Sequence, residues 1–145
     1  MFSYFDSSVL LSILLDEQQK EEAYYLWKNS KIRVSSILLK IESIIVLRRI
    51  YERYKTKLGN NWLKKKTGEL EQFLNEVNYR IIDEDIEKKI SLKKELSKCR
   101  TLDAIHIATA LEFREITDGE NINLYSFDIS MHELARSYKF NTNKM

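Results

Sequence analysis

Three acidic residues lie where the sequence pattern places the end of a strand or the start of a helix. Asp6 follows the apolar run 2–5, and Asp128 follows the apolar run 122–126. Asp103 falls in the first turn of a helix expected over 102–115. Each has a purely structural alternative, because aspartate caps helices well and is favoured in a first helical turn. In a parallel sheet, however, all three would converge on one edge.

Glu42 is different, because capping cannot explain it. It lies on an expected helix, with five apolar residues within positions 41–47. An acid in such surroundings is costly to bury unless a partner compensates its charge. Four carboxylates that come close repel one another, and their pKa values rise unless a cation is present. Oxygen ligands suit Mg²⁺ or Mn²⁺, and one or two such ions can activate water for in-line attack on a phosphodiester.

The elements that must position these acids alternate between short apolar runs and amphipathic stretches. Strands are expected over 2–5, 32–35, 79–82 and 122–126, with a weak fifth over 139–142. Helices are expected over 7–16, 19–28, 36–58, 62–77, 83–98, 102–115 and 129–138, and turns at Gly59 and Gly119. This alternation predicts an α/β fold of parallel strands with helices on both faces. We expect residues 1–145 to form one domain, since no linker or repeat interrupts them.

Composition excludes several classes of protein. The lone Cys99 cannot form a disulfide within the chain, so a reducing cytoplasm is the simplest location. The longest apolar stretch, 9–15, has seven residues, whereas a membrane span needs about 20. Asp6 also falls where the apolar region of a signal peptide would begin. The segment 48–66 carries eight basic residues against Glu52 alone, which suits either a polyanion or a solvated helix face.

Four short blocks carry a pattern that spans nearly the whole chain. They are Tyr4-Phe5-Asp6-Ser7-Ser8, Ser35-Ser36 with Glu42 on the following helix, Leu-Asp-Ala-Ile-His-Ile-Ala-Thr-Ala over 102–110, and Ser126-Phe127-Asp128. The block around Asp103 is the most specific of the four. In this order and spacing, the blocks resemble the PIN-domain family, and within it the VapC-type toxins of toxin–antitoxin pairs.

The resemblance implies a three-layer α/β/α sandwich with a short, mostly parallel sheet of four or five strands. It implies a Mg²⁺- or Mn²⁺-dependent endoribonuclease in which Asp6, Glu42, Asp103 and Asp128 bind one or two ions. It also implies a homodimer and an antitoxin that blocks the site. Ser126 stands where the family usually has Thr, and the retained hydroxyl can still bond to a carboxylate. Segment 50–80 aligns least well.

Several other residues have two interpretations each. Arg49 and Arg53 continue the helix face of Glu42 and could hold RNA phosphates, or else form surface salt bridges. The aromatics Tyr51, Tyr54 and Trp62 could stack on bases, although packing explains them better. Ser7 could hydrogen-bond within the acidic site or cap a helix.

His106 lies three residues after Asp103, so it could share that face as a general base or as a supporting group. A packed, hydrogen-bonded histidine is the simpler interpretation.

Two competing functions remain for comparison with a nuclease. A PIN-like module that binds RNA or protein without cutting would keep the fold and could keep the acids. A phosphatase with an aspartyl-phosphate intermediate needs a second Asp two residues after the first, but Ser7-Ser8 follow Asp6. A phosphate loop of the GxxxxGK[ST] type is absent from the sequence, which argues against a nucleoside triphosphatase of that class.

Overall fold

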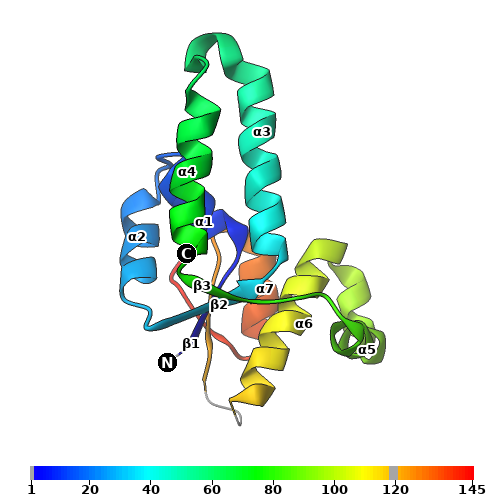
Figure 1. Cartoon of the computed structure of the whole chain (residues 1–145). Coiled ribbons are helices and arrows are strands. Elements are labelled where there is room, and N and C mark those ends of the chain that lie inside the picture. Colours follow the sequence, from blue (N-terminus) through cyan, green and yellow to red (C-terminus); the bar gives the residue numbers. More distant parts are fainter. Residues whose placement is uncertain (1, 118–120) are drawn as a thin grey trace.

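A computed structural model describes residues 2–117 and 121–145 (Figure 1). Its strands are β1 Phe2–Phe5, β2 Ile32–Ser36, β3 Val77–Arg80, β4 Asn123–Tyr125 and β5 Asn141–Thr142. Its helices are α1 Ser7–Leu14, α2 Lys20–Lys28, α3 Leu38–Leu58, α4 Trp62–Leu74, α5 Glu84–Leu92, the 3₁₀ helix η1 Lys94–Lys98, α6 Thr101–Ile116 and α7 Ile129–Ser137.

The five strands form one sheet in the order β3-β2-β1-β4-β5, and every pairing is parallel. β1 is the middle strand, with Tyr4 opposite Val34 of β2 on one side and Leu124 of β4 on the other. Parallel strands need crossover connections, and helices supply them here. The predicted parallel sheet, including its weak fifth strand, is therefore confirmed.

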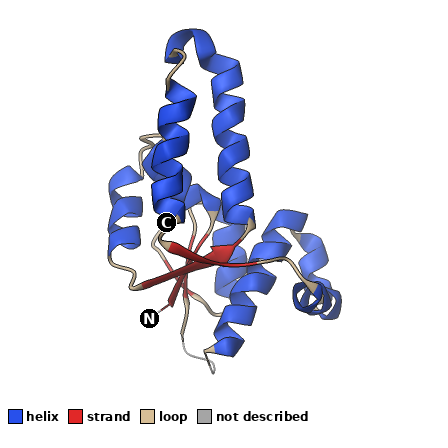
Figure 2. Cartoon of the chain, in the orientation of Figure 1, coloured by secondary structure: helices blue, strands red, loops and turns tan. Residues whose placement is uncertain are grey.

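Helices cover both faces of the sheet and complete the α/β/α sandwich (Figure 2). Successive side chains of a strand point to opposite faces. Tyr4 accordingly packs into the core beneath α6 and α7, whereas Phe5 packs into the core beneath α1 to α4. Both side chains are fully buried, which explains why β1 reads as a nearly continuous apolar run.

Helices α3 and α4 form a hairpin that extends beyond the sheet (Figure 1). The 21 residues of α3 correspond to about 31 Å of helix, with a kink at Tyr54, where φ is −125° and ψ is 19°. The hairpin turns at Gly59, whose φ of 83° is readily adopted only by glycine. Tyr51 and Trp62 stack across it, with ring centroids 6.5 Å apart and planes at 9°. Packing between the two helices thus accounts for this aromatic pair.

Some predicted boundaries are wrong. The third strand is Val77–Arg80 rather than 79–82, because pairing with β2 places Val77 opposite Arg33. The helix expected over 83–98 ends at Leu92 and resumes as η1, since Lys93 leaves the helical conformation. The turn predicted at Gly119 lies outside the described residues. No helix in the described ranges is long and apolar enough to cross a bilayer.

Candidate active site

The structure brings the four predicted acids to one cleft of about 270 Å³ at the carboxyl edge of the sheet. Asp6 follows the middle strand β1 directly, and Asp103 lies in the first turn of α6. Asp128 stands between β4 and α7, and Glu42 lies near the start of α3. The four side chains therefore come from elements spread over the whole fold but line a common opening.

Asp6 is the most deeply placed of the four, with 6% of its surface exposed. Its Oδ1 accepts hydrogen bonds from the backbone N–H of Ser8, at 2.8 Å, and from the Ser8 hydroxyl. Its Oδ2 accepts one from Ser126 Oγ at 2.5 Å. Burial raises the pKa of Asp6, although these hydrogen bonds oppose the shift. Asp6 thus caps α1 and also points a costly charge at the cleft.

Glu42 is held by His106, whose Nε2 lies 2.7 Å from Glu42 Oε1. The other ring nitrogen, Nδ1, lies 2.6 Å from the hydroxyl of Tyr4. Burial raises the pKa of Tyr4, so the phenol keeps its proton. The Tyr4 oxygen also accepts from the N–H of Ser36 at 3.2 Å. Because a carboxylate oxygen only accepts, we place a proton on Nε2 of His106, which then donates to Glu42.

Asp103 and Asp128 share a single cationic partner, Arg100. Arg100 Nε lies 3.0 Å from Asp103 Oδ2, and Arg100 Nη2 lies 2.9 Å from Asp128 Oδ2. The other oxygen of Asp128 accepts from the N–H of Met131 at 3.1 Å, which caps α7. Partial burial works against it, but the bonds from Met131 and Arg100 hold the pKa of Asp128 below its ordinary value.

A hard divalent cation fits the chemistry of this donor set. All four acids offer carboxylate oxygens to one cleft, and oxygen ligands are those that Mg²⁺ and Mn²⁺ prefer. As the described side chains stand, no three His, Cys, Asp or Glu residues are close enough together to hold an ion. Two of the acids are instead bound by Arg100, which neutralises part of their mutual repulsion.

The two serines predicted to support the site differ in their contacts. Ser126 Oγ donates to Asp6, so this hydroxyl lies where the sequence places it. Ser7 lines the cleft, but the hydrogen bonds to Asp6 come from the next residue, Ser8. The Ser8 hydroxyl also accepts from the N–H of Phe127 at 2.8 Å, which joins the ends of β1 and β4.

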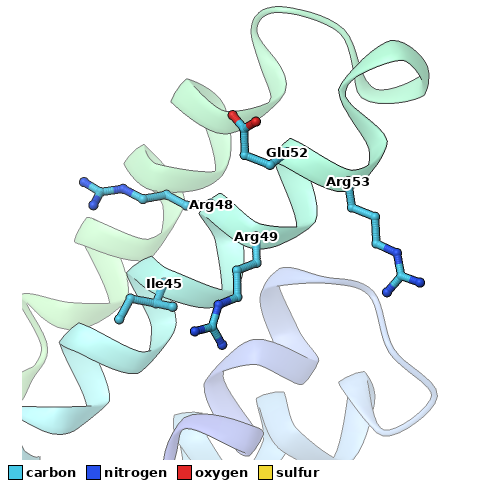
Figure 3. Close-up of a pocket in the computed structure, with 5 residues that line it drawn as sticks. All are labelled: Ile45, Arg48, Arg49, Glu52 and Arg53. Carbon is cyan, nitrogen blue, oxygen red and sulfur yellow. The ribbon is translucent and has the colours of Figure 1, made fainter.

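Arg49 and Arg53 are not part of the carboxylate cleft. They line a separate pocket of about 480 Å³ on α3, together with Ile45, Arg48 and Glu52. Figure 3 shows Arg49 and Arg53 extending to the same side of α3, whereas Arg48 extends to a different side. The two predicted arginines therefore form a basic surface on the helical hairpin, beyond the acids.

Sequence reasoning missed Arg100, Ser8 and Tyr4 as parts of the site. Arg100 precedes Asp103 by three residues, a spacing that places side chains together on a helix and could have revealed the pair. No comparable signal exists for Tyr4, which meets His106 across 102 residues of sequence.

The fold and the cleft define a parallel α/β/α domain with an acidic site at the carboxyl edge of its sheet. The family model described as PIN domain matches residues 3–137 of this sequence, nearly its full length. The chain therefore belongs to the PIN domain family. A search of curated proteins finds no significant match.

Solved structures with the same fold include two from toxin–antitoxin systems. A chain of a toxin–antitoxin complex from Klebsiella pneumoniae aligns with a TM-score of 0.61 at 17% identity, covering 87% of this chain and 86% of that one. A chain of VapBC2 from Rickettsia felis, bound to a DNA fragment from their promoter, aligns with a TM-score of 0.65 at 13% identity. That alignment covers 100% of this chain and 99% of the other. At these identities the likeness shows the fold.

Proposed function

We propose that this PIN domain is a metal-dependent endoribonuclease and the toxin of a type II toxin–antitoxin pair. The observation that carries the proposal is the meeting of Asp6, Glu42, Asp103 and Asp128 in one cleft. A carboxylate cluster of this kind suits phosphodiester hydrolysis with one or two Mg²⁺ or Mn²⁺ ions. When bound, such a cation activates water and stabilises the negative charge that develops on the phosphate.

The chain's own residues hold the four carboxylates ready for this chemistry. Asp6 is the central ligand, fixed by Ser8 and Ser126 so that its charge faces the cleft. Glu42 is oriented by the Nε2–H of His106, a donor that is itself held by Tyr4. Supporting hydrogen bonds of this kind fix the geometry of metal ligands and strengthen them. Asp103 and Asp128 complete the set, and both line the same cleft.

Outside the cleft, RNA contacts the basic surface of the α3–α4 hairpin. Arg49 and Arg53 project from α3, and further lysines lie in the sequence on both sides of the turn between α3 and α4. Guanidinium groups bind phosphate oxygens without regard to sequence and so position the strand. The contribution of this surface should weaken as salt rises, because phosphate contacts release counterions.

An antitoxin protein is the proposed partner, and it would act by covering the acidic cleft. The fold shared with chains of toxin–antitoxin complexes supports this assignment. We further propose that the chain is a single domain that works in the cytoplasm as a homodimer. The lone Cys99, which is free, is compatible with a reducing compartment.

The test is cleavage of cellular RNA by the purified, antitoxin-free protein with Mg²⁺, with Mn²⁺ and with EDTA. Asp103→Asn removes one proposed ligand, and Asp85→Asn is the matched control, because Asp85 is an exposed carboxylate paired with Arg80. Discrete fragments that need metal, persist with Asp85→Asn and vanish with Asp103→Asn would support the nuclease. Metal binding by a folded protein that cuts no RNA would favour the non-cutting binding module instead.

A further inference from the structure

Arg100 is a cation bound to two of the carboxylates that would hold the metal ion. Its guanidinium bridges Asp103 Oδ2 and Asp128 Oδ2, at 3.0 and 2.9 Å. These two carboxylates come from different elements, α6 and the β4–α7 connection, so the bridge is not a local helix contact alone. Arg100 therefore bonds to two of the four acids and compensates about one unit of their combined negative charge.

The same arginine is free to leave. Its side chain is 68% exposed and it precedes α6, where it makes no side-chain cap of that helix. Water and salt screen the exposed guanidinium, although Asp103, with 11% of its side chain exposed, is screened less. Asp128 also keeps its other oxygen on the N–H of Met131, so its position survives the loss of Arg100. A divalent cation can replace the guanidinium because its own charge would compensate the carboxylates that Arg100 leaves.

A displaced Arg100 would still face the cleft. Among the described residues that line the cleft, it is the only lysine or arginine. A guanidinium matches phosphate oxygens with two parallel N–H donors, as well as it matches carboxylates. A phosphodiester that enters the cleft would give Arg100 a new anionic partner in place of the two carboxylates.

We propose that Arg100 exchanges partners during the reaction cycle. Without metal it is the internal counter-ion of Asp103 and Asp128, and with a cation held by these carboxylates it would bind the scissile phosphate of the RNA. The inference rests on the proposed function, since it needs a metal-dependent nuclease. It assigns to one residue two opposite effects, competition with the metal and assistance to the substrate.

The experiment compares Arg100→Ala, Arg100→Lys and Lys98→Ala. Lys98→Ala is the matched control, because Lys98 is an exposed cation two residues earlier in η1 and forms none of the described ion pairs with these acids. Mn²⁺ affinity is measured calorimetrically without RNA, and cleavage of an RNA that the wild type cuts is measured in single turnover at saturating Mn²⁺.

For Arg100→Ala we expect Mn²⁺ to bind about two- to tenfold more tightly, since the guanidinium no longer competes with the metal for Asp103 and Asp128. Cleavage at saturating Mn²⁺ should slow at least about tenfold, since a donor to the phosphate is lost. Arg100→Lys should fall between, because it keeps the charge without the two-pronged geometry. Lys98→Ala should change neither quantity by more than about twofold.

Other results would overturn the proposal in distinguishable ways. Unchanged or weaker Mn²⁺ binding by Arg100→Ala would mean that Arg100 holds the carboxylates in place rather than competing with the metal. Tighter binding with unchanged cleavage would overturn the transfer to phosphate. A wild-type protein that binds no Mn²⁺ or cuts no RNA would instead overturn the proposed function, and the inference with it.

Discussion

Replacing Asp6 by Asn should stabilise the metal-free protein, although it removes the central carboxylate. Asp6 is buried, and its pKa is raised by that burial, so its charged form opposes folding. Asparagine keeps an oxygen for the N–H of Ser8, removes the charge, and replaces Oδ2 by an amide N–H that can donate to Ser126 Oγ but not accept from it. Residues at active sites commonly exchange stability for function. We therefore expect a gain of about 1–2 kcal/mol, or roughly 3–6 °C in Tm for a chain of this size.

The sign of the pH dependence follows from the direction of the shift. The folded-state pKa of Asp6 lies above its unfolded-state pKa of about 3.9. The Asp6 side chain therefore contributes to stability below about pH 3.9, and this contribution is lost as pH rises through the folded-state pKa. The advantage of Asp6→Asn should therefore be small near pH 4, grow as pH rises through the folded pKa, and then level off. Saturating metal should make the wild type more stable than Asp6→Asn, since a ligand at 100 times its Kd stabilises the protein that binds it by about 2.7 kcal/mol.

Urea unfolding of both proteins, in EDTA and in excess Mg²⁺ across this pH range, measures these differences. Asp85→Asn is the control, because Asp85 is exposed and paired with Arg80, and its loss should not raise stability. An Asp6→Asn variant that is less stable than wild type in EDTA near pH 8 would refute the reasoning. So would equal stabilisation of the two proteins by Mg²⁺.

Three further changes have expected outcomes. His106→Leu should lower Mn²⁺ affinity by about 10-fold or more, with partial rescue by His106→Gln, which can still donate to Glu42; wild-type affinity in the leucine variant would exclude a positioning role. Gly59→Ala should cost about 1–2 kcal/mol in urea unfolding without slowing RNA cleavage, because φ is 83° in open space. Burial raises the pKa of Tyr79 to about 12, so its contribution is present below pH 10 and lost as pH rises through 12. At pH 7, Tyr79→Phe should lower the free energy of unfolding by about 1 kcal/mol, because the Tyr79 hydroxyl donates to the carbonyl of Leu74. Between pH 10 and 12, the free energy of unfolding of this variant should fall less steeply with pH than that of the wild type.

The sequence was informative where a local pattern has a direct spatial meaning. Apolar runs followed by Asp6 and Asp128 locate two strand ends, and parallel strands necessarily bring such ends to one edge of a sheet. Glu42 lies in an apolar stretch of its helix, where burial of its charge is costly without a partner. The sequence predicted that such a partner exists but did not identify the residue. These patterns were enough to predict the sheet and to select the acids that line the cleft.

The remaining features depend on contacts between distant parts of the chain. His106 meets Glu42 across 64 residues, and no local spacing encodes that hydrogen bond. The third strand was displaced by two residues because Ile81 and Ile82 look like strand residues but are 66% and 44% exposed. Pairing with β2, rather than local hydrophobicity, decides which residues enter that strand.

The location of Mn²⁺ in crystals of the protein, found from its anomalous scattering, tests the central claim most directly. If the four carboxylates form the metal site, a peak should lie in the cleft among Asp6, Glu42, Asp103 and Asp128, with Arg100 turned away from the acids. The peak should disappear in crystals of Asp6→Asn. A cleft without Mn²⁺ at saturating concentration, or a peak that persists in Asp6→Asn, would contradict the assignment of these residues as the metal site.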